Sequence, residues 1–164
     1  ESEEDTELSR AKYVQLLYTM KIYVLGSSHF MHEMVAVSVQ LRAMGYEGWI
    51  HPDYEAFVRG EKQEHVRRWQ NGERAALKRE NNYLKSHYKG ILESDVIVFV
   101  NAEKNGRKNY IGGNVLMEMG QAYVNNKKIF LLYDLPTDSA YIDEIESMDP
   151  VCLHGDLKNI AKYV

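Results

Sequence analysis

Five consecutive apolar residues, Val96 to Val100, constrain the fold of this 164-residue chain more than any other feature. A strand that is apolar at every position leaves no side for water, so both of its faces must be covered. Such a strand is typical of the middle of a parallel sheet with helices on each side. A second apolar run, Ile129 to Tyr133, has the same character. Both runs are far shorter than the roughly 20 apolar residues of a membrane-spanning helix.

Strand and helix patterns alternate along the rest of the chain. Short β-rich runs are expected at 22–25, 49–50, 95–101, 128–133 and 151–153, and helical patterns at 31–44, 61–92, 115–125, 138–148 and 157–163. This order predicts an α/β fold, a three-layer sandwich with a mainly parallel, Rossmann- or flavodoxin-like sheet of five strands. We expect one domain over residues 20–164, and residues 1–19 to be an N-terminal extension, either appended or part of a non-native start.

Charge and cysteine content narrow the classes of function. The formal net charge of −4 makes nucleic acid an unfavoured partner. The single cysteine, Cys152, allows no internal disulfide and agrees with a cytoplasmic location. Basic residues nevertheless gather between Arg59 and Lys89. This stretch is either a solvated helix face, which is the usual case, or a surface that attracts an anionic small molecule.

Ligands of such folds bind beyond the carboxyl ends of the strands. That rule selects residues after four of the expected strands: Gly26, Ser27 and Ser28; His51, Pro52 and Asp53; Asn101; and Asp134. The first group can hold a phosphate with its N–H groups and hydroxyls, although no Walker motif or dinucleotide fingerprint is present. Asp53 either binds a ribose or base, or caps the next helix.

A glycine pair, Gly112 and Gly113, opens a helix beyond the buried strand and is followed by Asn114. Free N–H groups at such a start can bind an anion or a sugar hydroxyl. Glu118 lies about one turn into this helix, where the helix dipole should keep its carboxylate ionised. An ionised carboxylate can attack an anomeric carbon. Spacing alone favours the alternative that Glu118 only complements the dipole.

The segment Leu116-Met117-Glu118-Met119-Gly120-Gln121-Ala122-Tyr123, followed by Lys127-Lys128-Ile129, resembles the nucleoside 2-deoxyribosyltransferase-like family. Its relatives include the deoxynucleoside monophosphate N-glycosidases, and the resemblance covers residues 20–164. It implies that Glu118 attacks C1′ of a deoxyribose and releases a base. It also implies that Gly26 and Ser27 border the sugar or phosphate on one side, and Gly112, Gly113 and Asn114 on the other. It implies no metal and no cofactor, and it suggests a homo-oligomer.

Two positions depart from the family pattern. The family usually carries an aspartate eight residues ahead of the Asp95 position, where this chain has His87. His87 is by default a surface histidine of a helix, or else the acid that protonates the leaving base. The usual acidic residue ahead of the glycine turn is also missing, since Tyr110 and Ile111 stand there.

Several functions therefore stay open, and the first two belong to different classes. The first is cleavage or transfer of an N-glycosidic bond in a nucleoside or nucleotide, with Glu118 and His87 as the catalytic residues. The second is a non-catalytic nucleotide-binding module of the same fold. A hydrolase of NAD or a related dinucleotide ranks third, and nucleic-acid binding through the basic stretch from Arg59 to Lys89 ranks fourth. Asn101, Asp53 or His87 would orient the base. Four tyrosines are candidates for stacking on it: Tyr83, Tyr88, Tyr110 and Tyr123.

The pair His29 and His32, next to Glu33, is the only motif that suggests a metal site. Its order is not the His-Glu-x-x-His of a zinc-binding helix, so we predict no metal. His29 follows the first expected strand and is a further candidate for ligand contact.

Overall fold

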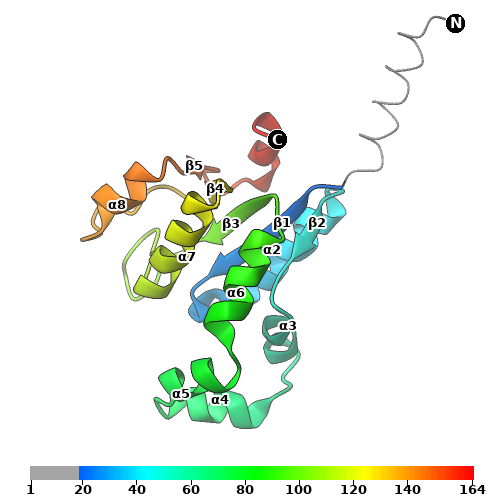
Figure 1. Cartoon of the computed structure of the whole chain (residues 1–164), viewed down its shortest axis with the longest axis vertical. Coiled ribbons are helices and arrows are strands. Elements are labelled where there is room, and N and C mark those ends of the chain that lie inside the picture. Colours follow the sequence, from blue (N-terminus) through cyan, green and yellow to red (C-terminus); the bar gives the residue numbers. More distant parts are fainter. Residues whose placement is uncertain (1–18) are drawn as a thin grey trace, which may run out of the picture.

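A five-stranded sheet with all strands parallel forms the centre of the computed structural model, which describes residues 19–164 (Figure 1). The strands are β1 (Lys21–Gly26), β2 (Glu47–Trp49), β3 (Val96–Val100), β4 (Lys128–Leu131) and β5 (Val151–Cys152). Their order across the sheet is β2-β1-β3-β4-β5, as in flavodoxin-like folds. The predicted fold class is confirmed. The N-terminal extension, apart from residue 19, lies outside the described residues.

Helices cover both faces of this sheet. They are α2 (Met31–Ala43), α3 (Pro52–Val58), α4 (Gln63–Gln70), α5 (Arg74–Glu80), α6 (Tyr83–Leu92), α7 (Gly113–Val124) and α8 (Ile142–Ser147), with the 3-10 helices η1 (Ser28–Phe30) and η2 (Leu157–Lys162). One core cluster joins α2 and η2 to the sheet, and a second joins α6, α7 and α8 to its other face. Every residue of β3 is at most 5% exposed, as its apolar sequence predicts. No helix within residues 19–164 is long and apolar enough to cross a membrane.

The chain between β2 and β3 differs from the expected long helix with one break. The break at Asn71-Gly72 is confirmed, and a second one occurs at Asn82, whose φ of 53° is left-handed. Helix α3 was not predicted from the sequence. This helix begins at Pro52 with His51 as its N-cap, because Nδ1 of His51 accepts the Asp53 N–H at 3.2 Å. The alternative that Asp53 is the cap is therefore wrong.

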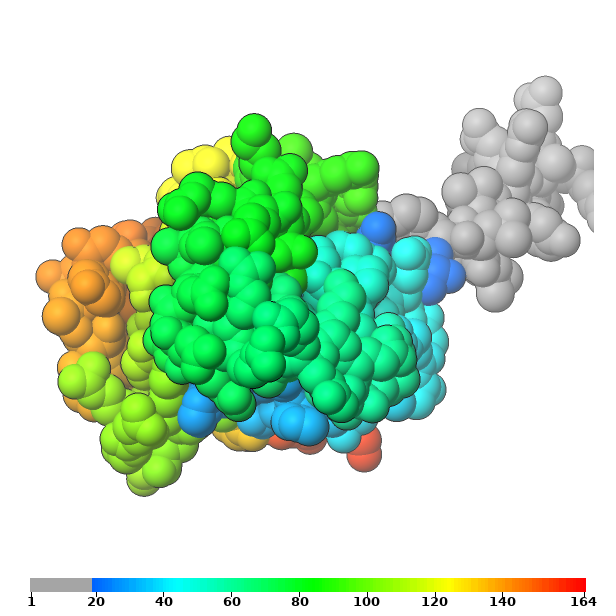
Figure 2. All heavy atoms as spheres, turned by 90° about the horizontal axis from the view of Figure 1, so that it is seen from below, coloured from blue at the N-terminus to red at the C-terminus, as the bar shows by residue number. Residues whose placement is uncertain are grey.

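Helices α4 and α5 form an arm, residues 63–80, that projects beyond the lower end of the sheet in Figure 1. Figure 2, which views the molecule from below, shows this green arm in front of the sheet. No residue of α4 is buried, and Leu77 of α5, 1% exposed, anchors the arm. Arg68 holds the two helices together, since its guanidinium pairs with Glu73 and Glu80 at 2.8 Å. Exposed ion pairs of this kind stabilise weakly, so we regard the arm as the least strongly packed part of the domain.

Candidate active site

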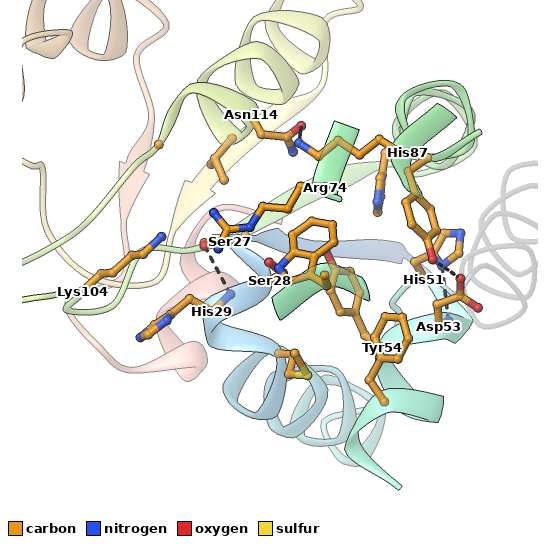
Figure 3. Close-up of a pocket in the computed structure, with 18 of the residues that line it drawn as sticks. Ser27, Ser28, His29, His51, Asp53, Tyr54, Arg74, His87, Lys104 and Asn114 are labelled. Carbon is orange, nitrogen blue, oxygen red and sulfur yellow. Dashed lines mark hydrogen bonds between the residues drawn. The ribbon is translucent and has the colours of Figure 1, made fainter. Parts of the chain in front are cut away.

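A cavity of about 760 Å³ lies between the arm, the carboxyl end of β1 and the start of α7 (Figure 3). The strand order reverses between β1 and β3, and α/β proteins of this kind bind ligands at such a switch point. Most of the predicted site residues line this cavity: Gly26, Ser27, Ser28, Asp53, His87, Gly112, Gly113 and Asn114. His29, His32, Tyr83 and Tyr110 line it as well, whereas Tyr88 and Tyr123 do not and are exposed elsewhere.

Asn101 has a different place. Its side chain is fully buried and does not line the cavity. Its Nδ2 donates to the carbonyl of Asp134 at 2.8 Å, and its Oδ1 accepts the N–H of Tyr133 at 2.9 Å. Both ends of the amide therefore tie β3 to the segment after β4, and neither is free for a base.

Glu118 is enclosed behind the first turn of α7. It is 2% exposed and is not itself a lining residue, whereas Asn114 and Val115 of the preceding turn are. Its Oε1 accepts a hydrogen bond from Nδ2 of Asn114 at 3.0 Å, and its Oε2 has no partner within residues 19–164. In turn, Oδ1 of Asn114 accepts from Nζ of Lys78 at 3.3 Å.

The protonation state of Glu118 differs from the expectation. Burial raises its pKa to about 8, although the hydrogen bond from Asn114 and the charge of Lys78 act in the opposite direction. The expectation that the helix dipole keeps this carboxylate ionised is therefore wrong at neutral pH. Glu118 is the sixth residue of α7, and the dipole effect fades within the first turn, so desolvation prevails.

His87 is buried, 7% exposed, so the default interpretation as a surface histidine is wrong. Its Nδ1 lies 2.7 Å from the hydroxyl of Tyr23 in β1. Burial raises the pKa of Tyr23 far above its usual value, so the hydroxyl keeps its proton, and no other acceptor for it exists within residues 19–164. We therefore assign Tyr23 as the donor, which places the ring proton of His87 on Nε2.

Desolvation by burial lowers the pKa of His87 to about 4, so its ring is neutral across the physiological range. Nε2 has no partner within the described part of the chain, and the residue lines the cavity. A neutral imidazole of this kind can donate a hydrogen bond to a ligand but carries no charge to it.

Rings surround His87 at one end of the cavity. Centroids of neighbouring rings are 4.9–6.4 Å apart in a group that comprises His51, Tyr54, Phe57, His65, Tyr83 and His87. Asp53 fixes this wall by accepting from the Tyr83 hydroxyl at 2.6 Å and by pairing with Lys62. Burial raises the pKa of Asp53, but its bonds to Lys62 and Tyr83 outweigh this, so it stays ionised. Flat rings with polar edges suit a planar heterocycle.

Three cations line the cavity: Arg74, Lys78 and Lys104. In Figure 3 the Arg74 side chain ends beside Ser27, and Lys104 lies on the side of Ser27 away from Asp53. No carboxylate of residues 19–164 forms an ion pair with Arg74, Lys78 or Lys104. Arg74 lies 5.9 Å from the ring of Trp69, and Lys104 lies 4.8 Å from the ring of Tyr110. The basic stretch thus turns part of its charge toward the cavity, because both Arg74 and Lys78 belong to it.

Four residues of the site were not among the predicted ones: Tyr23, Tyr54, Lys78 and Lys104. Tyr23 carried one usable signal, a hydroxyl inside an otherwise apolar strand, which must find a partner when buried. Lys78 lay within the predicted basic stretch, but nothing local shows which way a lysine in a helix or loop points.

No group of three or more histidine, cysteine or acidic side chains in the described part of the chain could hold a metal ion. Comparison with protein-family models, with curated proteins and with solved structures gives no match for this chain. Its function is therefore argued from the site itself.

Proposed function

We propose that this protein cleaves the N-glycosidic bond of a nucleotide, with Glu118 as the nucleophile. The observation that carries this proposal is the buried carboxyl of Glu118, which has one oxygen held by Asn114 and the other, Oε2, without a partner. Leaving a buried polar atom unpaired costs about 1–3 kcal/mol, and such costs are typical of functional sites. The raised pKa and the adjoining cavity point in the same direction.

In the proposed reaction Oε2 attacks C1′ of the sugar while the C1′–N bond breaks. The base leaves with the bonding electrons and takes a proton from water, and a glycosyl ester of Glu118 remains. Water or a second base then attacks C1′ and releases Glu118, and two displacements retain the anomeric configuration. Because Glu118 does not line the cavity, the attack requires Asn114 or Val115 to shift when the sugar binds.

The remaining residues are assigned by their chemistry. His87 donates from Nε2 to the departing base, as a neutral hydrogen-bond donor and not as an imidazolium. The rings near Asp53 receive the base, and Arg74 and Lys104 bind the phosphate. Gly112, Gly113 and Asn114 present the uncapped first turn of α7, whose free N–H groups suit a sugar hydroxyl. The resemblance of residues 116–129 to deoxyribosyltransferases supports the same assignment.

The test is chromatography of free base after incubation of the purified protein with deoxynucleosides, deoxynucleoside monophosphates and NAD. We expect base release from monophosphates in preference to nucleosides, because Arg74 and Lys104 have no carboxylate partner within residues 19–164 and are available to an anion. If NAD is the one compound cleaved, with release of nicotinamide, the substrate is a dinucleotide and not a monophosphate. Absence of release from every compound would contradict it.

A second candidate function is nucleotide binding without turnover. It is favoured by the enclosure of Glu118, whose raised pKa of about 8 keeps it protonated at neutral pH. Recovery of intact nucleotide from the purified protein, together with micromolar binding and no base release, would establish this function in place of the first.

We further propose that the protein is a homo-oligomer, located in the cytoplasm. Large apolar side chains are exposed on α6 and α7, two helices in mutual contact: Leu84, Tyr88, Leu92, Met117, Tyr123 and Val124. Exposed large apolar side chains on neighbouring helices are a feature of interfaces. We expect sedimentation to show a dimer or larger assembly, and Val124→Glu to lower its mass, whereas sedimentation of the unaltered chain as a monomer would contradict the proposal.

A further inference from the structure

A chain of two hydrogen bonds links the arm to the buried carboxyl. Nζ of Lys78, in α5, donates to Oδ1 of Asn114 at 3.3 Å, and Nδ2 of Asn114 donates to Oε1 of Glu118 at 3.0 Å. Lys78 is half-buried and forms no other hydrogen bond or ion pair within residues 19–164. The ammonium group of Lys78, from the arm, thus contacts Asn114, which in turn binds Glu118.

The chemistry of the three groups fixes the direction of this chain. An ammonium group only donates hydrogen bonds, so it must face the oxygen of the Asn114 amide. The NH₂ end of that amide then faces Glu118, where it can only donate. An ionised carboxylate accepts such a bond well, whereas the opposite amide orientation would present an oxygen and favour a protonated carboxyl.

We propose that Lys78 is a positioning residue, whose ammonium holds the Asn114 amide in the orientation that supports the ionised form of Glu118. As a step in catalysis this inference rests on the proposed function, because only a nucleophilic Glu118 needs to be ionised. It gives the arm a second role in the site, beside the proposed binding of phosphate by Arg74.

The other groups around Glu118 do not duplicate this effect. Tyr23 of β1 and Tyr54 of α3 interact with its charge, but both tyrosines have raised pKa values and remain neutral. Among the described residues, Lys78 is the only cation whose charge acts to lower the pKa of Glu118. Loss of Lys78 therefore removes both a favourable charge and the constraint on the amide.

The experiment measures the ionisation of Glu118 directly, by carbon NMR of carboxyl-labelled protein as a function of pH, with Glu118→Gln identifying the resonance. In the unaltered protein the midpoint is expected near pH 8. In Lys78→Met it should rise by at least one unit, a tenfold decrease of the ionisation constant. Lys78→Arg, which retains charge and donors, should restore most of the difference.

Lys89→Met is the matched control. It removes the same charge from an exposed site in α6, where Lys89 pairs with Glu93, and should leave the midpoint unchanged. A midpoint in Lys78→Met equal to that of the unaltered protein would overturn the proposal, as would an equal shift in both variants. Lys78→Gln, which keeps a donor without a charge, should give an intermediate midpoint and serves if Lys78→Met does not fold.

Asn114→Leu separates positioning from a general effect of charge. If Lys78 acts through the amide, combining Lys78→Met with Asn114→Leu should shift the midpoint by clearly less than the sum of the single shifts, and an additive result would contradict positioning. The titration does not depend on turnover. If the midpoint shifts as expected but no nucleotide releases its base, the proposed function is contradicted and the role of Lys78 is not. If base is released but the midpoint in Lys78→Met does not shift, the role of Lys78 is contradicted and the proposed function is not.

Discussion

Replacement of Glu118 by glutamine should lower kcat for base release by about 10³-fold or more, because the amide cannot form the glycosyl ester. Glutamine has nearly the same shape as glutamate, and its Oε1 can still accept from Asn114, so binding of the nucleotide should change little. A loss confined to kcat, with an unchanged dissociation constant by calorimetry, is the expected pattern. A variant that keeps more than a tenth of the activity would exclude Glu118 as the nucleophile.

The same variant should be more stable than the unaltered protein at alkaline pH. Between the usual glutamate pKa of 4.5 and about 8, folded Glu118 holds a proton that the unfolded chain has released. The free energy of unfolding must then decrease as pH rises through this range, by up to about 1.4 kcal/mol per pH unit. Glutamine does not titrate, so it adds no such pH dependence to the free energy of unfolding. The stability of the variant relative to the unaltered protein should therefore increase from pH 5 to pH 9.

Urea denaturation at pH 5, 7 and 9 measures this gain, which we expect to reach on the order of 3 kcal/mol at pH 9. Glu144→Gln, at an exposed position of α8, is the control and should follow the unaltered protein at each pH. Parallel behaviour of Glu118→Gln and the control would show that burial of Glu118 is not costly. A residue that destabilises its own fold and is needed for turnover is the combination expected of a catalytic group.

The sheet could be predicted because its signals are local. Val96–Val100 is apolar at every position, and burial on two faces leaves no other interpretation. The end of a parallel strand is equally local information, and it selected Gly26 and Asp53, both of which line the cavity. The same rule misplaced Asn101, because an amide at a strand end can bond to neighbouring backbone as readily as to a ligand.

The protonation states of the site residues could not be predicted from the sequence, because they depend on contacts between residues far apart in the chain. His87 is neutral because it is buried against Tyr23, 64 residues away in the sequence. Lys78 reaches Asn114 over 36 residues, and only the path of the arm brings the two together. The position of Glu118 in its helix suggested an ionised group, whereas its burial, which spacing does not show, makes it a weak acid.

The pH dependence of kcat/KM tests these electrostatics together. If only the ionised form of Glu118 attacks, kcat/KM should rise about tenfold per pH unit below a pKa of about 8 and level off above it. The phosphate of the substrate itself ionises near pH 6, so the rise is best measured between pH 7 and pH 9. Lys78→Met should move the rise to higher pH, whereas Lys89→Met should not move it.

At alkaline pH kcat/KM should not fall again after this rise. The shape of the profile at higher pH therefore tests whether His87 acts as a neutral donor or as an acid. With a pKa of about 4, His87 is already neutral at pH 5 and loses no proton that turnover would need at higher pH. Asp53 stays ionised and Tyr23 keeps its proton over the same range, so neither adds a second transition. A bell-shaped profile with a fall near neutral pH would instead mean that His87 acts as an imidazolium acid. Loss of that fall in His87→Gln would then assign it to this ring.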